Sequence, residues 1–184
     1  MSDVVISFIR PRAIYEAGFS GSVTVPGGVT SFGCWLQGAG GAGRQYYDSF
    51  TALDWDDGGG GGAFVYFASD VLEAEWGTSL TLTVGSAVSN ANGEASTLTG
   101  TLNGVAISLS AGGGVKALPA TGGTASGGTT NIDGNGGELA NPGDGLPGAA
   151  GLPGGDGQDL IEPGGLGGLG VTSAENGYIV LEWG

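Results

Sequence analysis

The chain has 184 residues, of which 43 are glycine and one is cysteine, so it is predicted to form one domain without an internal disulfide framework. Its 18 acidic and 4 basic residues give a formal charge of −14, and such a surface repels phosphate backbones, which excludes nucleic acid as a partner. The absence of histidine removes the usual general base and the Ser-His and Cys-His pairs, so we expect a protein that is not an enzyme.

Residues 1–17 are predicted to form an N-terminal arm. Residues 4–9 have the composition of a short strand, and Arg10-Pro11-Arg12 ends it. Such a strand can add to a sheet edge of another subunit or pair with its own sheet. The expected attachment residues are Val4, Val5, Ile6, Phe8, Ile9, Arg10 and Arg12. The segment lacks the basic start and long apolar run of a signal peptide, so we expect a complete chain made in a cytosol, without membrane insertion.

Short alternating strands follow from residue 19. In one of them Phe32, Cys34 and Leu36 share a face, with Gly33, Trp35 and Gln37 on the other. Further strands are expected at residues 63–69, 79–84, 95–102, 105–110 and 177–183, with a hairpin turn at Asn103-Gly104 and one helical turn near 71–75. This spacing predicts a β-sandwich, in which Cys34 is a buried small apolar residue rather than a nucleophile.

An insert at residues 44–57 gathers aromatic and acidic side chains. It contains Tyr46, Tyr47, Phe50 and Trp55 among Asp48, Asp54, Asp56 and Asp57. Aromatic faces stack on sugar rings or fill protein pockets, and carboxylates accept hydrogen bonds from hydroxyl groups. The insert is therefore either an exposed loop that recognises a glycan or a partner protein, or a set of aromatic residues that closes one end of the sandwich. Its acids could serve glycan hydrolysis, but adjacent acids before a glycine run are more typical of a solvated loop.

Residues 111–170 are rich in glycine at every third position. One register is Gly145, Gly148, Gly151, Gly154 and Gly157, and another is Gly164, Gly167 and Gly170. A period of three is that of a polyproline II type helix, in which one position in three faces a close neighbour. A flexible linker and a collagen segment are the alternatives. Because a β-strand closes the chain afterwards, we expect residues 18–184 to form one domain: a sandwich from 18–110 plus 171–184, and a bundle of polyglycine II helices from 111–170.

Residues 154–162, GGDGQDLIE, match a nonapeptide repeat that binds calcium when several copies stack. Only one copy is present, so chance in a glycine-rich chain is the competing explanation. Asp156 and Asp159 are the candidate calcium ligands, and no other cofactor is expected.

The order of these pieces resembles the glycine-rich domain of bacteriophage tail-fibre and receptor-recognising proteins. The resemblance rests on SVTVPGGVTSFGCWLQGAGGAG at 22–43, GGGGGAFVYFASDVLEAEWGTSLTLTVG at 58–85 and the closing strand NGYIVLEW from Asn176. More distantly, the chain is similar to the glycine-rich domain of anaplastic-lymphoma-type receptor kinases. Both resemblances imply a jelly-roll-like antiparallel sandwich with an attached bundle of polyglycine II helices. The insert at 44–57 and the arm depart from the family pattern.

The resemblance implies a structural protein of the virion, in a tail fibre or tail tip, assembled in the host cytoplasm. Expected partners are other virion proteins and a bacterial surface glycan or outer-membrane protein, and a homotrimer is the first expectation by analogy. A capsid decoration or head-fibre protein is one alternative. An ice-binding protein is another, although scattered acidic residues do not suit a flat, regular ice-binding face.

Overall fold

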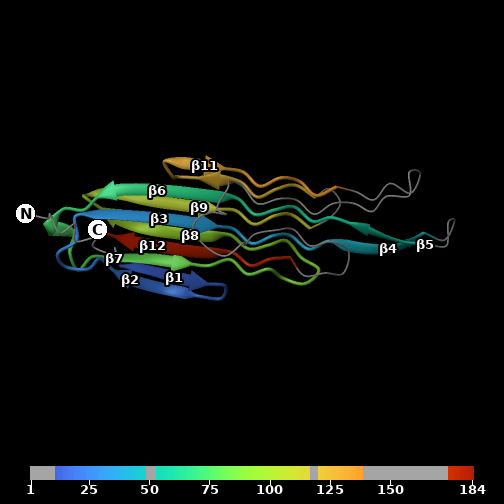
Figure 1. The fold of residues 1–184 in the computed structure, drawn as a ribbon, viewed down its shortest axis with the longest axis horizontal. Helices are drawn as coiled ribbons and strands as arrows, with labels where there is room; N and C mark the ends of the chain where they lie inside the picture. The colour runs from blue at the N-terminus through green and yellow to red at the C-terminus, as the bar shows by residue number, and fades with distance from the viewer. Residues whose placement is uncertain (1–10, 49–52, 117–119, 139–173) are drawn as a thin grey trace, which may run out of the picture.

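The computed structural model describes residues 11–48, 53–116, 120–138 and 174–184. Within these ranges the regular elements are β-strands and one 3-10 turn, η1 (Glu73–Glu75) (Figure 1). The strands are β1 (Arg12–Glu16), β2 (Ser20–Thr24), β3 (Ser31–Gln37), β4 (Arg44–Asp48), β5 (Leu53–Asp57), β6 (Phe64–Asp70), β7 (Ser79–Thr83), β8 (Ser96–Leu102), β9 (Val105–Ala111), β10 (Ala125–Ser126), β11 (Thr130–Ile132) and β12 (Tyr178–Trp183). The described part of the chain is therefore all-β, as the sequence predicted.

The strands form two five-stranded antiparallel sheets and one separate hairpin. The first sheet has the order β1-β12-β3-β6-β11, and the second has the order β10-β9-β8-β7-β2. Strands β4 and β5 pair only with each other. The last strand, β12, lies between β1 and β3, so the C-terminal residues complete the interior of the first sheet. Residues near the two ends of the chain thus belong to one folded unit.

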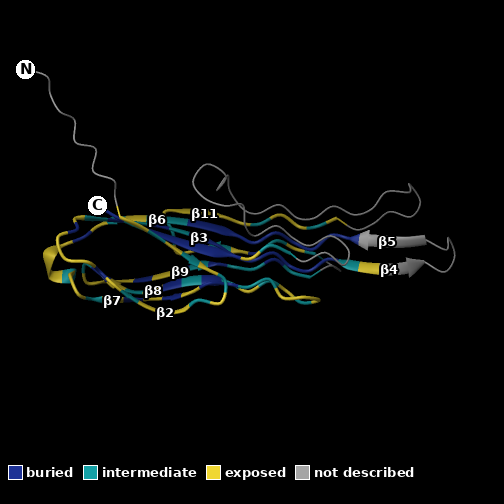
Figure 2. Ribbon diagram, turned by 60° about the horizontal axis from the view of Figure 1, so that its bottom comes forward, coloured by how far each residue is buried: buried dark blue, intermediate teal, exposed yellow. Residues whose placement is uncertain are grey.

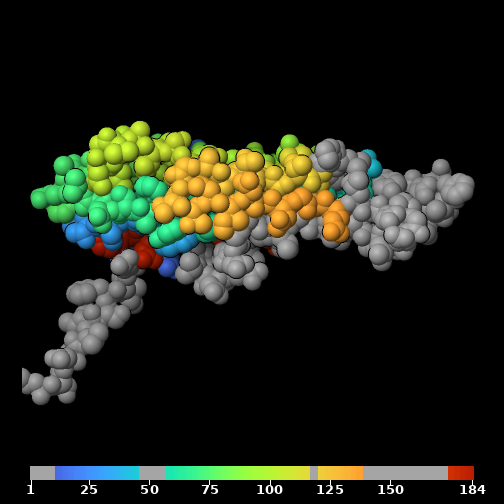
Figure 3. Space-filling model, turned by 90° about the horizontal axis from the view of Figure 1, so that it is seen from above, coloured from blue at the N-terminus to red at the C-terminus, as the bar shows by residue number. Residues whose placement is uncertain are grey.

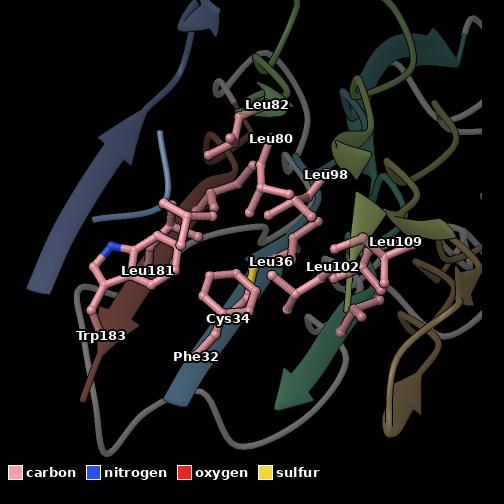
Figure 4. Packing of buried hydrophobic residues seen from close by; sticks show 14 of the residues in the cluster. Phe32, Cys34, Leu36, Leu80, Leu82, Leu98, Leu102, Leu109, Leu181 and Trp183 are labelled. Carbon is pink, nitrogen blue, oxygen red and sulfur yellow. The ribbon is translucent and has the colours of Figure 1, made fainter. Parts of the chain in front are cut away.

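One apolar core fills the space between the two sheets (Figure 4). The alternation along β3 turns Phe32, Cys34 and Leu36 into this core. Strand β12 adds Ile179, Leu181 and Trp183, and the facing sheet adds Leu80, Leu82, Leu98, Leu102, Ile107 and Leu109. Because each sheet buries its inner face against the other, the arrangement is a β-sandwich. The prediction of an antiparallel β-sandwich is therefore confirmed.

A two-residue turn joins β8 to β9, as predicted. Asn103 and Gly104 both have positive φ values, 55° and 72°, which a tight hairpin with the twist of its strands requires. The Asn103 side chain also ties this turn to the end of β6. Its amide group donates to the Asp70 carbonyl oxygen at 2.6 Å, and its Oδ1 accepts from the Leu72 amide at 3.0 Å.

Replacing Asn103 with alanine is expected to destabilise the fold by about 2 kcal/mol, because the variant loses these two hydrogen bonds and an asparagine at positive φ. Urea unfolding measures the change. Asn90→Ala is the matched control, since Asn90 has φ 59° but its side chain forms no hydrogen bond with the described part of the chain. Equal losses in the two variants would contradict a role for the Asn103 side chain.

Glycine-rich segments leave the sandwich at one end and run side by side toward the β4–β5 hairpin (Figure 1). We call these described segments the glycine stem. They are residues 38–43, 58–63, 85–95, 112–116, 120–124, 133–138 and 174–177. Four of them lie in the parts of the sequence that were expected to belong to the sandwich alone: 85–95, 174–177 and the two central segments 38–43 and 58–63. Figure 2 shows that burial continues from the sandwich into these central segments.

The backbone hydrogen bonds of residues 38–42 repeat every three residues. The amides of Gly38 and Gly41 donate to the segment 58–63, and those of Ala39 and Ala42 donate to the segment 85–95. The amide of Gly40 donates to a third segment, 174–177. The bonds run from Gly38 N to Ala63 O (2.9 Å), Gly41 N to Gly60 O (2.8 Å), Ala39 N to Glu94 O (3.1 Å), Ala42 N to Ala91 O (3.0 Å) and Gly40 N to Glu175 O (2.9 Å). A β-ladder alternates with a period of two, so this network differs from the pairing in the sheets.

Glycine is required where the segments of the stem touch. A Cβ atom at Gly60 would collide with the Thr121 carbonyl oxygen, and one at Gly114 would collide with the Gly60 carbonyl oxygen. Gly122 meets the carbonyl of Gly134 in the same way. The stem therefore packs backbone against backbone, and its amide groups are satisfied between segments rather than within one.

Buried polar groups join the sandwich to the stem. The Gln37 amide donates to the carbonyl oxygens of Gly62 and Ala63 at 3.1 and 3.0 Å. The Ser96 hydroxyl donates to the Gln37 carbonyl oxygen at 2.7 Å and accepts from the Gly85 amide at 3.0 Å. Both side chains are almost fully buried. Because buried polar groups must be paired, these bonds fix how the first stem residues leave β3, β6 and β7.

Five strands were not predicted. Two of them, β4 and β5, form in the insert at 44–57, where no strand was expected. Residues 12–16, which the sequence placed in an arm, form β1 and pair with β12, so this part of the predicted arm is a strand of the first sheet. Strands β10 and β11 fall in the region assigned to glycine helices, and they pair with β9 and β6 respectively. They thus add one edge strand to each sheet. Figure 3 shows residues 120–138 lying along the side of both the sandwich and the stem.

Candidate functional site

The aromatic insert forms the β4–β5 hairpin at the end of the stem, away from the sandwich (Figure 1). The register places Tyr46 opposite Trp55 and Tyr47 opposite Asp54. Phe50 lies outside the described residues. Because the hairpin lies away from the sandwich, its position favours a contact element over a set of aromatic residues that closes one end of the sandwich.

An ion pair closes the base of this hairpin. Arg44 and Asp57 are opposed in the register, and an Arg44 guanidinium nitrogen lies 3.3 Å from an Asp57 carboxylate oxygen. The Asp57 side chain is 2% exposed, whereas that of Arg44 is 40% exposed. A buried carboxylate is costly unless it is paired, so this arginine holds the first residue pair of the hairpin together.

The other predicted site residues are only partly described. Val4, Val5, Ile6, Phe8, Ile9 and Arg10 of the arm, and the candidate calcium ligands Asp156 and Asp159, lie outside the described residues. Among the residues that are described, no group of three or more metal-ligating side chains comes together. Arg12 is described, and it lies on β1 with its guanidinium 2.7 Å from the Glu182 carboxylate of β12.

Cys34 is fully buried in the sandwich core, as predicted. Burial raises the pKa of its thiol well above the ordinary value, because the apolar surroundings disfavour the thiolate. A nucleophilic cysteine needs the opposite shift and access to solvent. Cys34 is therefore a packing residue.

Cys34 is expected to resist maleimide in the native protein at pH 8 and to react fully in urea. Its raised pKa also means that the unfolded state loses the thiol proton first, so stability should fall as pH rises above about 8.5, by at most about 1.4 kcal/mol per pH unit. Unfolding measured between pH 8 and 9, below the range in which tyrosine ionises, tests this slope, and Cys34→Ala should remove it. Rapid labelling of the native protein would contradict the burial of the thiol.

A second surface, which the sequence did not single out, lies on the outer face of the first sheet. Trp35 of β3 and Tyr66 of β6 are opposed in the register, and their ring centroids lie 5.2 Å apart with 37° between the planes. A shallow depression of about 620 Å³ surrounds them. Its other lining residues are Arg12, Ser31, Phe32, Gly33, Ala68, Ser69, Asp70 and Glu182. We call this surface the aromatic platform.

Within the described ranges, no helix is long and apolar enough to cross a membrane. Neither a protein-family model nor a curated protein matches this sequence. Within the described residues, the candidate sites on structural grounds are the hairpin at the end of the stem and the aromatic platform on the sandwich.

Proposed function

We propose that this chain is a non-enzymatic structural protein of a bacteriophage virion, located in the tail fibre or tail tip, that presents its β4–β5 hairpin for recognition of the host surface. The observation that carries the proposal is the position of the hairpin. It lies at the far end of an elongated stem, and the sandwich lies at the other end (Figure 1). The resemblance to glycine-rich phage domains, based on residues 22–43 and 58–85, supports the same assignment.

We also propose that the glycine stem is a bundle of polyglycine II helices and that the sandwich is a variant of the jelly roll. Two features support the bundle. The hydrogen bonds of residues 38–42 have a period of three, which is the period of such helices, and glycines face neighbouring backbones where segments meet. The placement of β12 between β1 and β3 supports the jelly-roll comparison.

A bundle of this kind suits the proposed role mechanically. Each central segment is held by several neighbours, so the hairpin cannot swing without breaking backbone hydrogen bonds in more than one segment. A rigid support reduces the conformational entropy that a contact surface loses on binding. The aromatic residues Tyr46, Tyr47 and Trp55 are suited to such contact, because large rigid side chains supply contact area at low entropic cost.

The test is a binding assay with fluorescently labelled protein, candidate host cells and virus particles. The full chain should bind host cells, and a variant in which residues 46–55 are replaced by a short Asn-Gly turn should lose cell binding but keep its unfolding midpoint. Binding to particles without binding to cells would instead favour the capsid-decoration alternative. Equal cell binding by the full chain and the hairpin-deleted variant would contradict the role given to the hairpin.

A further inference from the structure

The aromatic platform has the chemistry of a binding site that differs from the hairpin. Trp35 and Tyr66 are both half-buried, whereas Tyr178, which lies on the same outer face nearer the stem, is buried. The partly exposed pair therefore lies farther from the stem than the buried end of this face. Two partly exposed aromatic rings side by side on one sheet face form an apolar surface on which a ligand can lie.

Gly33 shapes the platform. A Cβ atom at Gly33 would lie 3.2 Å from the six-membered ring of Trp35. The indole therefore leans over the glycine and lies along the sheet instead of standing away from it. The neighbouring Tyr66 ring is tilted by only 37° from the indole, so the two rings together form a broad, gently angled apolar surface.

Polar groups surround this surface at fixed positions. Arg12 is held by Glu182 at 2.7 Å, and its guanidinium carbon lies 5.8 Å from the centre of the Trp35 ring, near the outer limit of a cation–π contact. Asp70, on the other side, is exposed. The rim thus offers both donors and carboxylate acceptors to a ligand with many hydroxyl groups.

We propose that the aromatic platform binds a neutral saccharide. The apolar C–H face of a pyranose ring would lie on Trp35 and Tyr66, and its hydroxyl groups would pair with Arg12, Glu182 and Asp70. Charge favours a neutral sugar over an acidic one, because two of these three rim residues are carboxylates and the whole chain carries −14. An acidic glycan would meet repulsion that the single arginine, already paired with Glu182, does not offset.

The experiment is a glycan-array screen with the full chain, followed by calorimetric titration of the best neutral oligosaccharide. We expect saturable binding to neutral glycans, with Trp35→Ala and Tyr66→Ala each weakening the affinity by about tenfold or more through loss of ring stacking. Val105→Ala is the control, because Val105 is 63% exposed but lies in the second sheet. It should leave the affinity unchanged.

Asp70→Asn provides a variant that does not depend on aromatic packing. Asp70 is exposed, so the substitution should preserve the fold, and weaker sugar binding would then report a direct contact. Absence of saturable binding to any neutral glycan, binding restricted to acidic glycans, or unchanged affinity in all three platform variants would each overturn the proposal.

The inference does not depend on the virion assignment. Sugar binding by purified protein tests the platform, whereas cell and particle binding by the hairpin variant tests the proposed function.

Discussion

Replacing Gly114 with alanine is expected to destabilise the protein by about 3 kcal/mol or more, because overpacking against a backbone cannot be relieved by a change of rotamer. A Cβ atom at this position would overlap the carbonyl oxygen of Gly60, and Gly114 also accepts a hydrogen bond from the Gly93 amide at 2.9 Å. To make room, the segment containing Gly114 would have to move away from two neighbours. Urea unfolding followed by circular dichroism measures the loss.

The matched control for this substitution is Gly27→Ala. Gly27 lies in the loop between β2 and β3, and a Cβ atom there would have no neighbour within 4 Å. This variant should be as stable as the wild type or slightly more stable, since alanine reduces the entropy of the unfolded chain. If both variants unfolded at the wild-type midpoint, the glycine stem would not be a packed part of the fold.

Replacing Phe32 with alanine is expected to cost about 3 to 5 kcal/mol, the usual range for removing a buried phenylalanine from a core. Phe32 is 2% exposed, and its ring centroid lies 4.6 Å from that of Trp183 and 6.3 Å from that of Phe67. The substitution thus leaves a cavity where β3, β6 and β12 pack together. Thermal and urea unfolding of the variant measure the loss.

Ile14→Ala is the control for the core. Ile14 lies on the edge strand β1 and is 53% exposed, so its truncation should change stability by less than about 0.5 kcal/mol. A small effect of Phe32→Ala, comparable with that of Ile14→Ala, would mean that the two sheets do not share the core seen in Figure 4.

The strands of the sandwich were predictable where alternation was strong. In β3 the alternation of Phe32, Cys34 and Leu36 with Gly33, Trp35 and Gln37 predicted the strand and its two faces, and Asn103-Gly104 predicted the turn between β8 and β9. Strand β10 has two residues and β11 has three, which is too short for any period to appear. Tertiary pairing with β9 and β6, rather than local preference, makes these residues extended.

The stem was only partly predictable. The three-residue glycine period predicted extended packed segments within residues 111–170, but residues 58–62 are consecutive glycines, in which no period can be seen. In residues 38–43 the buried Ala39 and Ala42 stand among the glycines. The structure uses these two segments at the centre of the hydrogen-bond network. Glycine runs alone do not reveal which carbonyl groups they approach, because the partners are separated by tens of residues in the sequence.

The aromatic platform was the least predictable feature. The sequence placed Trp35 on the face opposite Phe32, Cys34 and Leu36, but residues 63–69 are almost entirely apolar and do not reveal which way Tyr66 points. Only the pairing of β3 with β6 brings Trp35 opposite Tyr66, and only the pairing of β1 with β12 brings Arg12 to Glu182. The hairpin, by contrast, was visible as an aromatic insert because its residues are contiguous.

Amide hydrogen exchange gives the most direct test of the claim that the glycine segments and the sandwich form one folded body. The amides of Gly38, Gly41 and Gly60 donate to other segments of the stem, so they should exchange with protection comparable to that of β3. Mass spectrometry of peptides covering residues 38–43, 58–63 and 112–116 measures this protection. Exchange of these amides at the rate of a free peptide, with β3 still protected, would contradict the account.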